Sequence, residues 1–173
     1  MNSNQLKAQI REVMDFPKAG ICFKDITTIL QNKVAFKAAI DLLAKEYYKH
    51  EIDLIVGPEA RGFIVGAPLA YVLGTGFIPV RKPGKLPAAT ETIEYDLEYG
   101  SNKLQMHRDA IKPGQKVLVA DDLLATGGTA AATVKLVEKM GGNIVGVGFL
   151  IELQFLNGRE LLAPYQVKSL IQY

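Results

Sequence analysis

The chain has 173 residues, and its 20 lysine or arginine residues against 18 aspartate or glutamate residues leave a net charge of +2. Hydrophobic residues make up 49% and charged residues 22%, which excludes bulk disorder and, at this length, favours a single domain over residues 1–173. The balanced charge gives no reason to expect a nucleic-acid partner.

The single cysteine, Cys22, excludes an intramolecular disulfide and fits a reducing compartment. The N-terminus lacks the apolar core of a signal peptide, and no apolar run reaches the roughly 18 residues of a membrane helix. We therefore expect a cytoplasmic protein that has no membrane partner.

The first third of the chain predicts two helices around an irregular segment. Apolar residues recur at helical spacing from Leu6 to Val13, so the first fifteen residues predict a short amphipathic helix. Residues 16–30 mix proline, glycine and single apolar residues without a period, and residues 1–30 together predict a hood. A longer helix is then predicted by a stripe of apolar residues: Phe36, Ile40, Leu43 and Tyr47.

After the hood, short apolar segments of strand length alternate with helical segments. The predicted strands are Ile52–Val56, Phe77–Val80, Val117–Ala120 and Ile144–Ile151. A helix is predicted over Phe63–Leu73, and another by the apolar face from Ala130 to Val137, which Gly141 ends. This alternation predicts an α/β fold: a doubly wound, mostly parallel sheet flanked by helices.

Residues 82–103 interrupt the alternation directly after a predicted strand. They contain Pro83, Gly84, Pro87 and many polar residues, which predicts a long loop without regular structure. A loop of this length in a compact domain is usually functional or disordered, and its position predicts a flexible lid.

The segment VLVADDLLATGGT, residues 117–129, carries the sharpest chemical signal. A buried strand is followed by Asp121 and Asp122, and ligands of open α/β sheets bind beyond the carboxyl ends of strands. A loop of small residues then opens a helix, whose free N–H groups and positive dipole end suit a phosphate. This loop consists of Ala125, Thr126, Gly127, Gly128 and Thr129. The two acids would repel a phosphate, so we expect them to bind ribose hydroxyls or orient a hydrated Mg²⁺.

This segment resembles the motif with which type I phosphoribosyltransferases bind 5-phosphoribosyl-1-pyrophosphate (PRPP). Four more segments resemble the adenine phosphoribosyltransferase family and occur in that family's order: FPKAGICFKDI (16–26), GPEARGF (57–63), RKPGKLP (81–87) and LEYG (97–100). The resemblance implies transfer of the phosphoribosyl group of PRPP to N9 of adenine, yielding AMP and pyrophosphate. It also implies Mg²⁺ as cofactor and a homodimer.

The resemblance implies roles for residues at the pyrophosphate. Glu59, Ala60, Arg61 and Gly62 form the loop that grips this group, commonly through a cis peptide bond that does not involve proline. Arg81, Lys82 and Lys85 supply further positive charge.

For the base, the resemblance implies that Phe23 stacks on adenine and that Leu153 packs on its other face. Backbone groups near Cys22 and Lys24 read the edge with the exocyclic amine. Lys24 stands where many relatives have arginine, which a backbone contact tolerates.

Two Glu-Tyr pairs lie in the expected lid, Glu94-Tyr95 and Glu98-Tyr99. Only the second has the Leu-Glu-Tyr-Gly context of the family. There Glu98 is the expected acid/base for the proton at adenine N7 or N9, and Tyr99 is expected to cap the closed site.

Three alternatives share parts of this pattern. Another phosphoribosyltransferase would use xanthine, guanine or hypoxanthine, and the PRPP loop alone does not exclude it. A PRPP-sensing regulator of the same fold would need an added helix-turn-helix or a basic face. A PRPP-making diphosphokinase would need an ATP site and a much longer chain.

Overall fold

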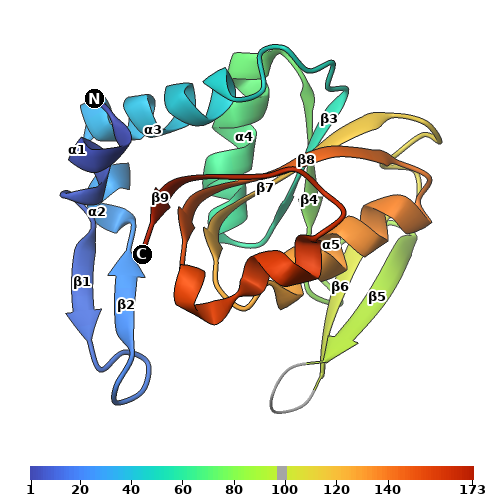
Figure 1. The fold of residues 1–173 in the computed structure, drawn as a ribbon. Helices are drawn as coiled ribbons and strands as arrows, with labels where there is room; N and C mark the ends of the chain where they lie inside the picture. The colour runs from blue at the N-terminus through green and yellow to red at the C-terminus, as the bar shows by residue number, and fades with distance from the viewer. Residues whose placement is uncertain (97–100) are drawn as a thin grey trace.

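The computed structural model describes residues 1–96 and 101–173. Its centre is a five-stranded sheet in the order β4-β3-β7-β8-β9, in which all neighbouring strands are parallel (Figure 1). The strands are β3 (Leu54–Pro58), β4 (Gly76–Val80), β7 (Lys116–Leu124), β8 (Asn143–Glu152) and β9 (Val167–Gln172). The α/β class and the mostly parallel sheet predicted from the sequence are confirmed.

Helices cover both faces of this sheet. On one face lie α3 (Lys33–Lys45) and α4 (Arg61–Leu73), and on the other lies α5 (Gly128–Lys139). Strand β7 separates two apolar clusters: Leu118 packs with α3 and α4, whereas Val119 packs with α5. Successive strand residues point to opposite faces, so a segment buried on both faces is apolar throughout, as Val117–Ala120 of β7 is.

The N-terminal segment differs from the predicted helix followed by an irregular hood. Helix α1 covers only Ser3–Lys7, and β1 (Arg11–Met14) then pairs antiparallel with β2 (Cys22–Asp25), which α2 (Thr27–Leu30) follows. The side chain of Asn2 caps the short helix. The apolar spacing that predicted a longer helix is outweighed by the hairpin, because pairing with β2 satisfies the backbone groups of β1.

The expected loop at residues 82–103 is, in most of its described part, a β-hairpin. Strand β5 (Thr90–Asp96) pairs antiparallel with β6 (Ser101–His107), and β5 packs against α5. Leu104 and Met106 alternate inward on β6 and are buried. Pro83, Gly84 and Pro87, which predicted a loop, precede the hairpin. They lie in residues 83–89, which do lack regular structure.

Two further differences concern strands β7 and β9. Strand β7 continues beyond Ala120 to Leu124, so Asp121 and Asp122 lie within it instead of after it. Strand β9 was not predicted from the sequence, and it places the C-terminus beside β2 (Figure 1). Among the described residues, no helix has the length and apolar character needed to span a bilayer.

Candidate functional site

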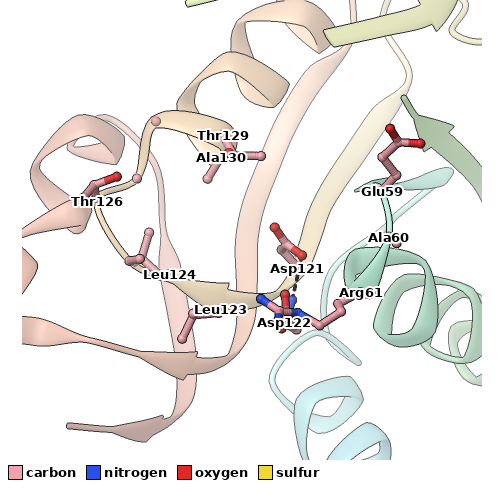
Figure 2. Close-up of a pocket in the computed structure, with 13 residues that line it drawn as sticks. Glu59, Ala60, Arg61, Asp121, Asp122, Leu123, Leu124, Thr126, Thr129 and Ala130 are labelled. Carbon is pink, nitrogen blue, oxygen red and sulfur yellow. Dashed lines mark hydrogen bonds and ion pairs between the residues drawn. The ribbon is translucent and has the colours of Figure 1, made fainter. Parts of the chain in front are cut away.

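A cavity of about 410 Å³ opens at the carboxyl ends of β3 and β7 and the N-terminus of α5. Figure 2 shows its two walls, with Glu59, Ala60 and Arg61 on one side and the acids with the loop that follows them on the other, and Arg61 pointing toward Asp122. Thirteen residues line it: Glu59, Ala60, Arg61, Asp121, Asp122, Leu123, Leu124, Ala125, Thr126, Gly127, Gly128, Thr129 and Ala130. The cavity therefore brings together ten of the residues singled out in the sequence.

The two aspartates are held by close contacts. Asp122 is only 5% exposed, and its Oδ2 lies 2.6 Å from Nε of Arg61 at the start of α4. Its backbone N–H donates to Oδ1 of Asp121 over 2.8 Å. Gly62 allows this arrangement, because a Cβ there would lie 2.8 Å from the same Asp121 oxygen. Any side chain at position 62 would push Asp121 away.

Burial disfavours negative charge on both carboxylates. The pKa of Asp121 is well above its ordinary value because of its burial and the neighbouring charge of Asp122. Burial also raises the pKa of Asp122, although the guanidinium of Arg61 lowers it in part. A ligand that donates hydrogen bonds to these buried carboxylates, or brings positive charge near them, would therefore stabilise their ionised form.

The loop from Ala125 to Thr129 leads directly into α5. Gly127 has φ +85°, a conformation that favours glycine, and α5 begins at Gly128. The first N–H groups of a helix have no partner within it, so they are free to bind an anion in the cavity. On the outside of the loop, the hydroxyl of Tyr95 lies 3.2 Å from Oγ1 of Thr129.

The opposite wall carries the expected cis peptide bond, between Glu59 and Ala60. Glu59 accepts hydrogen bonds from Nε of Arg81 at 2.7 Å and from the backbone N–H of Lys82 at 3.0 Å. Burial raises the pKa of Glu59, but these hydrogen bonds outweigh it and hold the pKa below its ordinary value. Glu59 therefore stays ionised and orients Arg81. Lys82 and Lys85 are exposed and are not among the described residues that line the cavity.

A second cavity, of about 360 Å³, adjoins the first at Arg61. Phe23 lines it, and the Phe23 ring centroid lies 5.5 Å from Cζ of Arg61. Phe16 meets Phe23 edge to face, with ring centroids 5.2 Å apart. The remaining lining residues are Val13 and Asp25. This cavity is apolar and aromatic on one side and charged on the other, which suits a flat heterocycle.

The other residues expected at the base lie around this region without lining either cavity among the described residues. The ammonium of Lys24 is paired with Glu12 and lies 4.2 Å from the ring centroid of Tyr173. Its side chain is thus engaged away from the cavity, which leaves the backbone for a ligand. Cys22 is half-buried, and Leu153, just after β8, packs against the core.

Glu98 and Tyr99, the expected acid/base and cap, lie outside the described residues. Tyr95 was not predicted at the site, because its Glu-Tyr pair lacks the family's context. Gly62 was expected in the loop at the pyrophosphate, but its close approach to Asp121 was not predicted. The contacts of both residues depend on segments far apart in the chain.

A comparison with known families finds a phosphoribosyl transferase domain over residues 25–169. The chain is 59% identical to the adenine phosphoribosyltransferase of Clostridium tetani over 168 residues, which cover 97% of this chain and 98% of the relative.

Solved structures agree with this comparison. Adenine phosphoribosyltransferase from Thermoanaerobacter pseudethanolicus superposes with a TM-score of 0.97 at 55% identity, covering 99% of this chain and 100% of the other. The enzyme from Saccharomyces cerevisiae, solved with adenine and an imino-altritol bisphosphate, gives a TM-score of 0.92 at 41% identity and covers 97% of both chains.

Proposed function

The chain belongs to the adenine phosphoribosyltransferase family, and we propose that its two adjoining cavities bind the two substrates of that reaction. The chain transfers the 5-phosphoribosyl group of PRPP to N9 of adenine, which yields AMP and releases pyrophosphate. Arg61 lines both cavities, and this observation supports the assignment of one substrate to each. The sugar of one ligand and the base of the other would meet beside Arg61.

The larger cavity suits PRPP. We assign its 5-phosphate to the loop from Ala125 to Thr129, whose backbone N–H groups and helix dipole favour an anion. Asp121 and Asp122 would accept hydrogen bonds from the ribose hydroxyls, and the burial of both acids favours such a donor. This arrangement would hold the ribose with C1 facing the second cavity.

The pyrophosphate group belongs on the opposite wall in this proposal. Its departure from C1 leaves an oxocarbenium-like sugar, so the site must stabilise negative charge on the leaving group. Backbone groups of the Glu59–Ala60 loop and the side chain of Arg61 border this space. Arg81 stands behind Glu59, and Lys82 and Lys85 would add charge from the segment that leads to the hairpin.

Adenine fits the smaller cavity. We assign Phe23 as the stacking partner, with Leu153 on the other face of the base and backbone groups near Cys22 and Lys24 reading its edge. The aromatic lining of the cavity supports the role of Phe23. The engagement of the Lys24 ammonium by Glu12 supports a backbone contact over a side-chain contact.

We propose Mg²⁺ as the cofactor. In the described part of the chain, no group of three or more His, Cys, Asp or Glu side chains is arranged to hold a metal. Asp121 and Asp122 are two carboxylates at the cavity, and proteins bind Mg²⁺ through one or two carboxylates together with substrate phosphates and water. We therefore expect PRPP and water to hold the ion near this pair. When bound, it would neutralise charge on the pyrophosphate.

Proton transfer and closure are assigned to Glu98 and Tyr99 on the resemblance of Leu-Glu-Tyr-Gly to the family motif. In the sequence they fall between β5 and β6, and Tyr95 of β5 contacts Thr129 in the cavity lining. Glu98 would exchange the proton at adenine N7 or N9. Tyr99 would close the site against water, which otherwise attacks the sugar cation.

We also propose a homodimer, because α4 carries an exposed apolar stripe. Ile64, Ala67 and Tyr71 follow one another at helical spacing, and Tyr71 is 88% exposed. Light scattering should give twice the chain mass of 18.9 kDa, and Tyr71→Glu should give the single mass. A monomeric wild-type protein would contradict the proposal. A cytoplasmic location, without nucleic-acid or membrane partners, is part of the same proposal.

The reaction is tested with purified protein, PRPP and Mg²⁺, offering adenine, hypoxanthine, guanine and xanthine in separate assays. AMP formation with adenine alone is expected. Turnover of an oxopurine in place of adenine would overturn the assignment of the base. Binding of PRPP without turnover of any base would favour a regulatory protein.

A further inference from the structure

A backbone contact supports the phosphate loop from outside the cavity. Gly158 lies at the start of η2 (Gly158–Leu162), the second of two short 3₁₀ helices after β8. A Cβ on Gly158 would lie 2.1 Å from the carbonyl oxygen of Ala125 and 2.8 Å from the backbone N of Gly127. A Cβ on Gly127 would lie 2.4 Å from the carbonyl oxygen of Gly158. The two segments therefore touch through their backbones, and neither glycine leaves room for a side chain.

The residue next to Gly158 is anchored to the sheet. Arg159 donates to Glu152 through Nε at 2.8 Å and Nη2 at 2.5 Å, and its Nη1 donates to the carbonyl oxygen of Val167 at 3.0 Å. Glu152 is 4% exposed and also accepts from the hydroxyl of Ser169 at 2.5 Å. A bidentate pair of this kind fixes direction as well as distance. The contacts of Arg159 tie η2 to the last residue of β8 and to the first residue of β9.

From these contacts we propose that Gly158, held by the Arg159–Glu152 ion pair, is a positioning residue for PRPP. The inference rests on the proposed function of the Ala125–Thr129 loop. Donors that bind a phosphate through the backbone have no side-chain freedom with which to adapt, so the loop must be held in place before the ligand arrives. The backbone of Gly158 supports the loop by contacting the backbone of Ala125 and Gly127.

This role predicts an effect on one substrate. Moving the loop alters the N–H groups that bind the 5-phosphate, and the loss of one hydrogen bond to a charged group lowers affinity about ten- to a hundredfold. The cavity lined by Phe23 lies on the other side of Arg61 and does not contain the loop. The Michaelis constant for PRPP should therefore change, and that for adenine should stay close to its wild-type value.

The test uses the full chain with Gly158→Ala and measures KM for both substrates together with the dissociation constant of PRPP. We expect KM and Kd for PRPP to rise at least about tenfold, with KM for adenine within about twofold. The matched control is Gly142→Ala, whose Cβ would lie 2.7 Å from a methyl of Val137 at the far end of the sheet. It should lower Tm and leave both KM values unchanged.

Arg159→Lys is the second variant, because lysine keeps the charge and loses the bidentate geometry. It should raise KM for PRPP by about threefold. If Gly158→Ala does not fold, this increase supports the positioning role and an unchanged KM for PRPP contradicts it. Unchanged PRPP affinity in a folded Gly158→Ala protein, or an equal loss in Gly142→Ala, would overturn the inference.

A third variant, Gly128→Val, separates this inference from the function on which it rests. It places a branched side chain in the lining of the cavity, so it should weaken PRPP binding whether or not Gly158 positions the loop. If Gly128→Val weakens PRPP binding and neither Gly158→Ala nor Arg159→Lys does, only the positioning role fails. If Gly128→Val leaves PRPP binding intact, the assignment of the loop itself fails.

Discussion

The guanidinium of Arg61 lies 2.6 Å from the carboxylate of Asp122, and this ion pair joins the two walls of the larger cavity. Arg61 begins α4 and Asp122 belongs to β7, so the contact links elements that are far apart in the chain. Arg61 also borders the aromatic cavity. In the proposed complex, the pair stands where sugar, pyrophosphate and base meet.

Asp122→Asn should weaken PRPP binding about ten- to a hundredfold, because it removes a charged hydrogen-bond acceptor and leaves Arg61 without its partner. Calorimetric titration with PRPP and Mg²⁺ measures the change. Asp41→Asn is the matched control, since Asp41 pairs with Lys37 on the exposed side of α3. Equal PRPP affinity in both variants would contradict the role of Asp122.

Tyr95→Phe removes only the hydroxyl that meets Thr129. Loss of one neutral hydrogen bond costs about 0.5–1.5 kcal/mol, so KM for PRPP should rise about two- to tenfold. Steady-state kinetics checks this result. Tyr48→Phe, at a tyrosine that is 60% exposed, should behave as wild type. A Tyr95→Phe protein with wild-type KM for PRPP would show that the hairpin does not support the loop through this contact.

Glu98→Gln should lower kcat by about 10²–10⁴-fold and leave PRPP affinity unchanged, because general acid/base assistance is lost while the phosphate site stays intact. Single-turnover kinetics separates the chemical step from product release. The control is Glu94→Gln in the first Glu-Tyr pair, where the carboxylate accepts a hydrogen bond from Ser101. Full activity of Glu98→Gln would remove Glu98 as the acid/base.

Glu152 links stability to pH. Hydrogen bonds from Arg159 hold the pKa of Glu152 below its ordinary value despite its burial. A lowered pKa in the folded state stabilises the protein above the unfolded pKa of about 4.3, and this contribution is lost as the pH falls through the folded value.

Glu152→Gln should therefore cost about 1–2 kcal/mol of unfolding free energy at pH 7 and progressively less below about pH 4. Urea unfolding at several pH values measures the difference between the two proteins. Glu51→Gln provides the comparison, because Glu51 pairs with Lys116 at the surface with 86% of its side chain exposed. A difference that grows as the pH falls would contradict the assigned sign.

Local patterns were enough to predict the α/β class and the group of consecutive residues that lines the larger cavity. In VLVADDLLATGGT, the strand, the acids and the loop are consecutive, so their joint position follows from one strand and one helix. The stripe from Phe36 to Tyr47 likewise predicted α3, although the helix ends at Lys45. Each of these features depends on residues within a single element or its neighbour.

Contacts between distant segments could not be predicted in this way. Val13 continues a helical spacing but pairs with Phe23 in a hairpin, and Tyr95 reaches Thr129 across 34 residues. The approach of Gly158 to Gly127 likewise leaves no periodic signal in the sequence. Hydrogen bonding and packing between segments decide such positions, and they outweigh local preference.

The most direct test of the central claim is a calorimetric titration of the wild-type protein and Gly128→Val with PRPP and Mg²⁺. Gly128 lines the cavity, and a Cβ there would already contact the ring of Tyr95 at 3.6 Å, so the branched valine side chain presses on Tyr95 or takes up space in the cavity. We expect saturable binding at one site per chain and a loss of affinity of at least about tenfold in the variant. Equal PRPP affinity in both proteins would contradict the placement of the phosphate site.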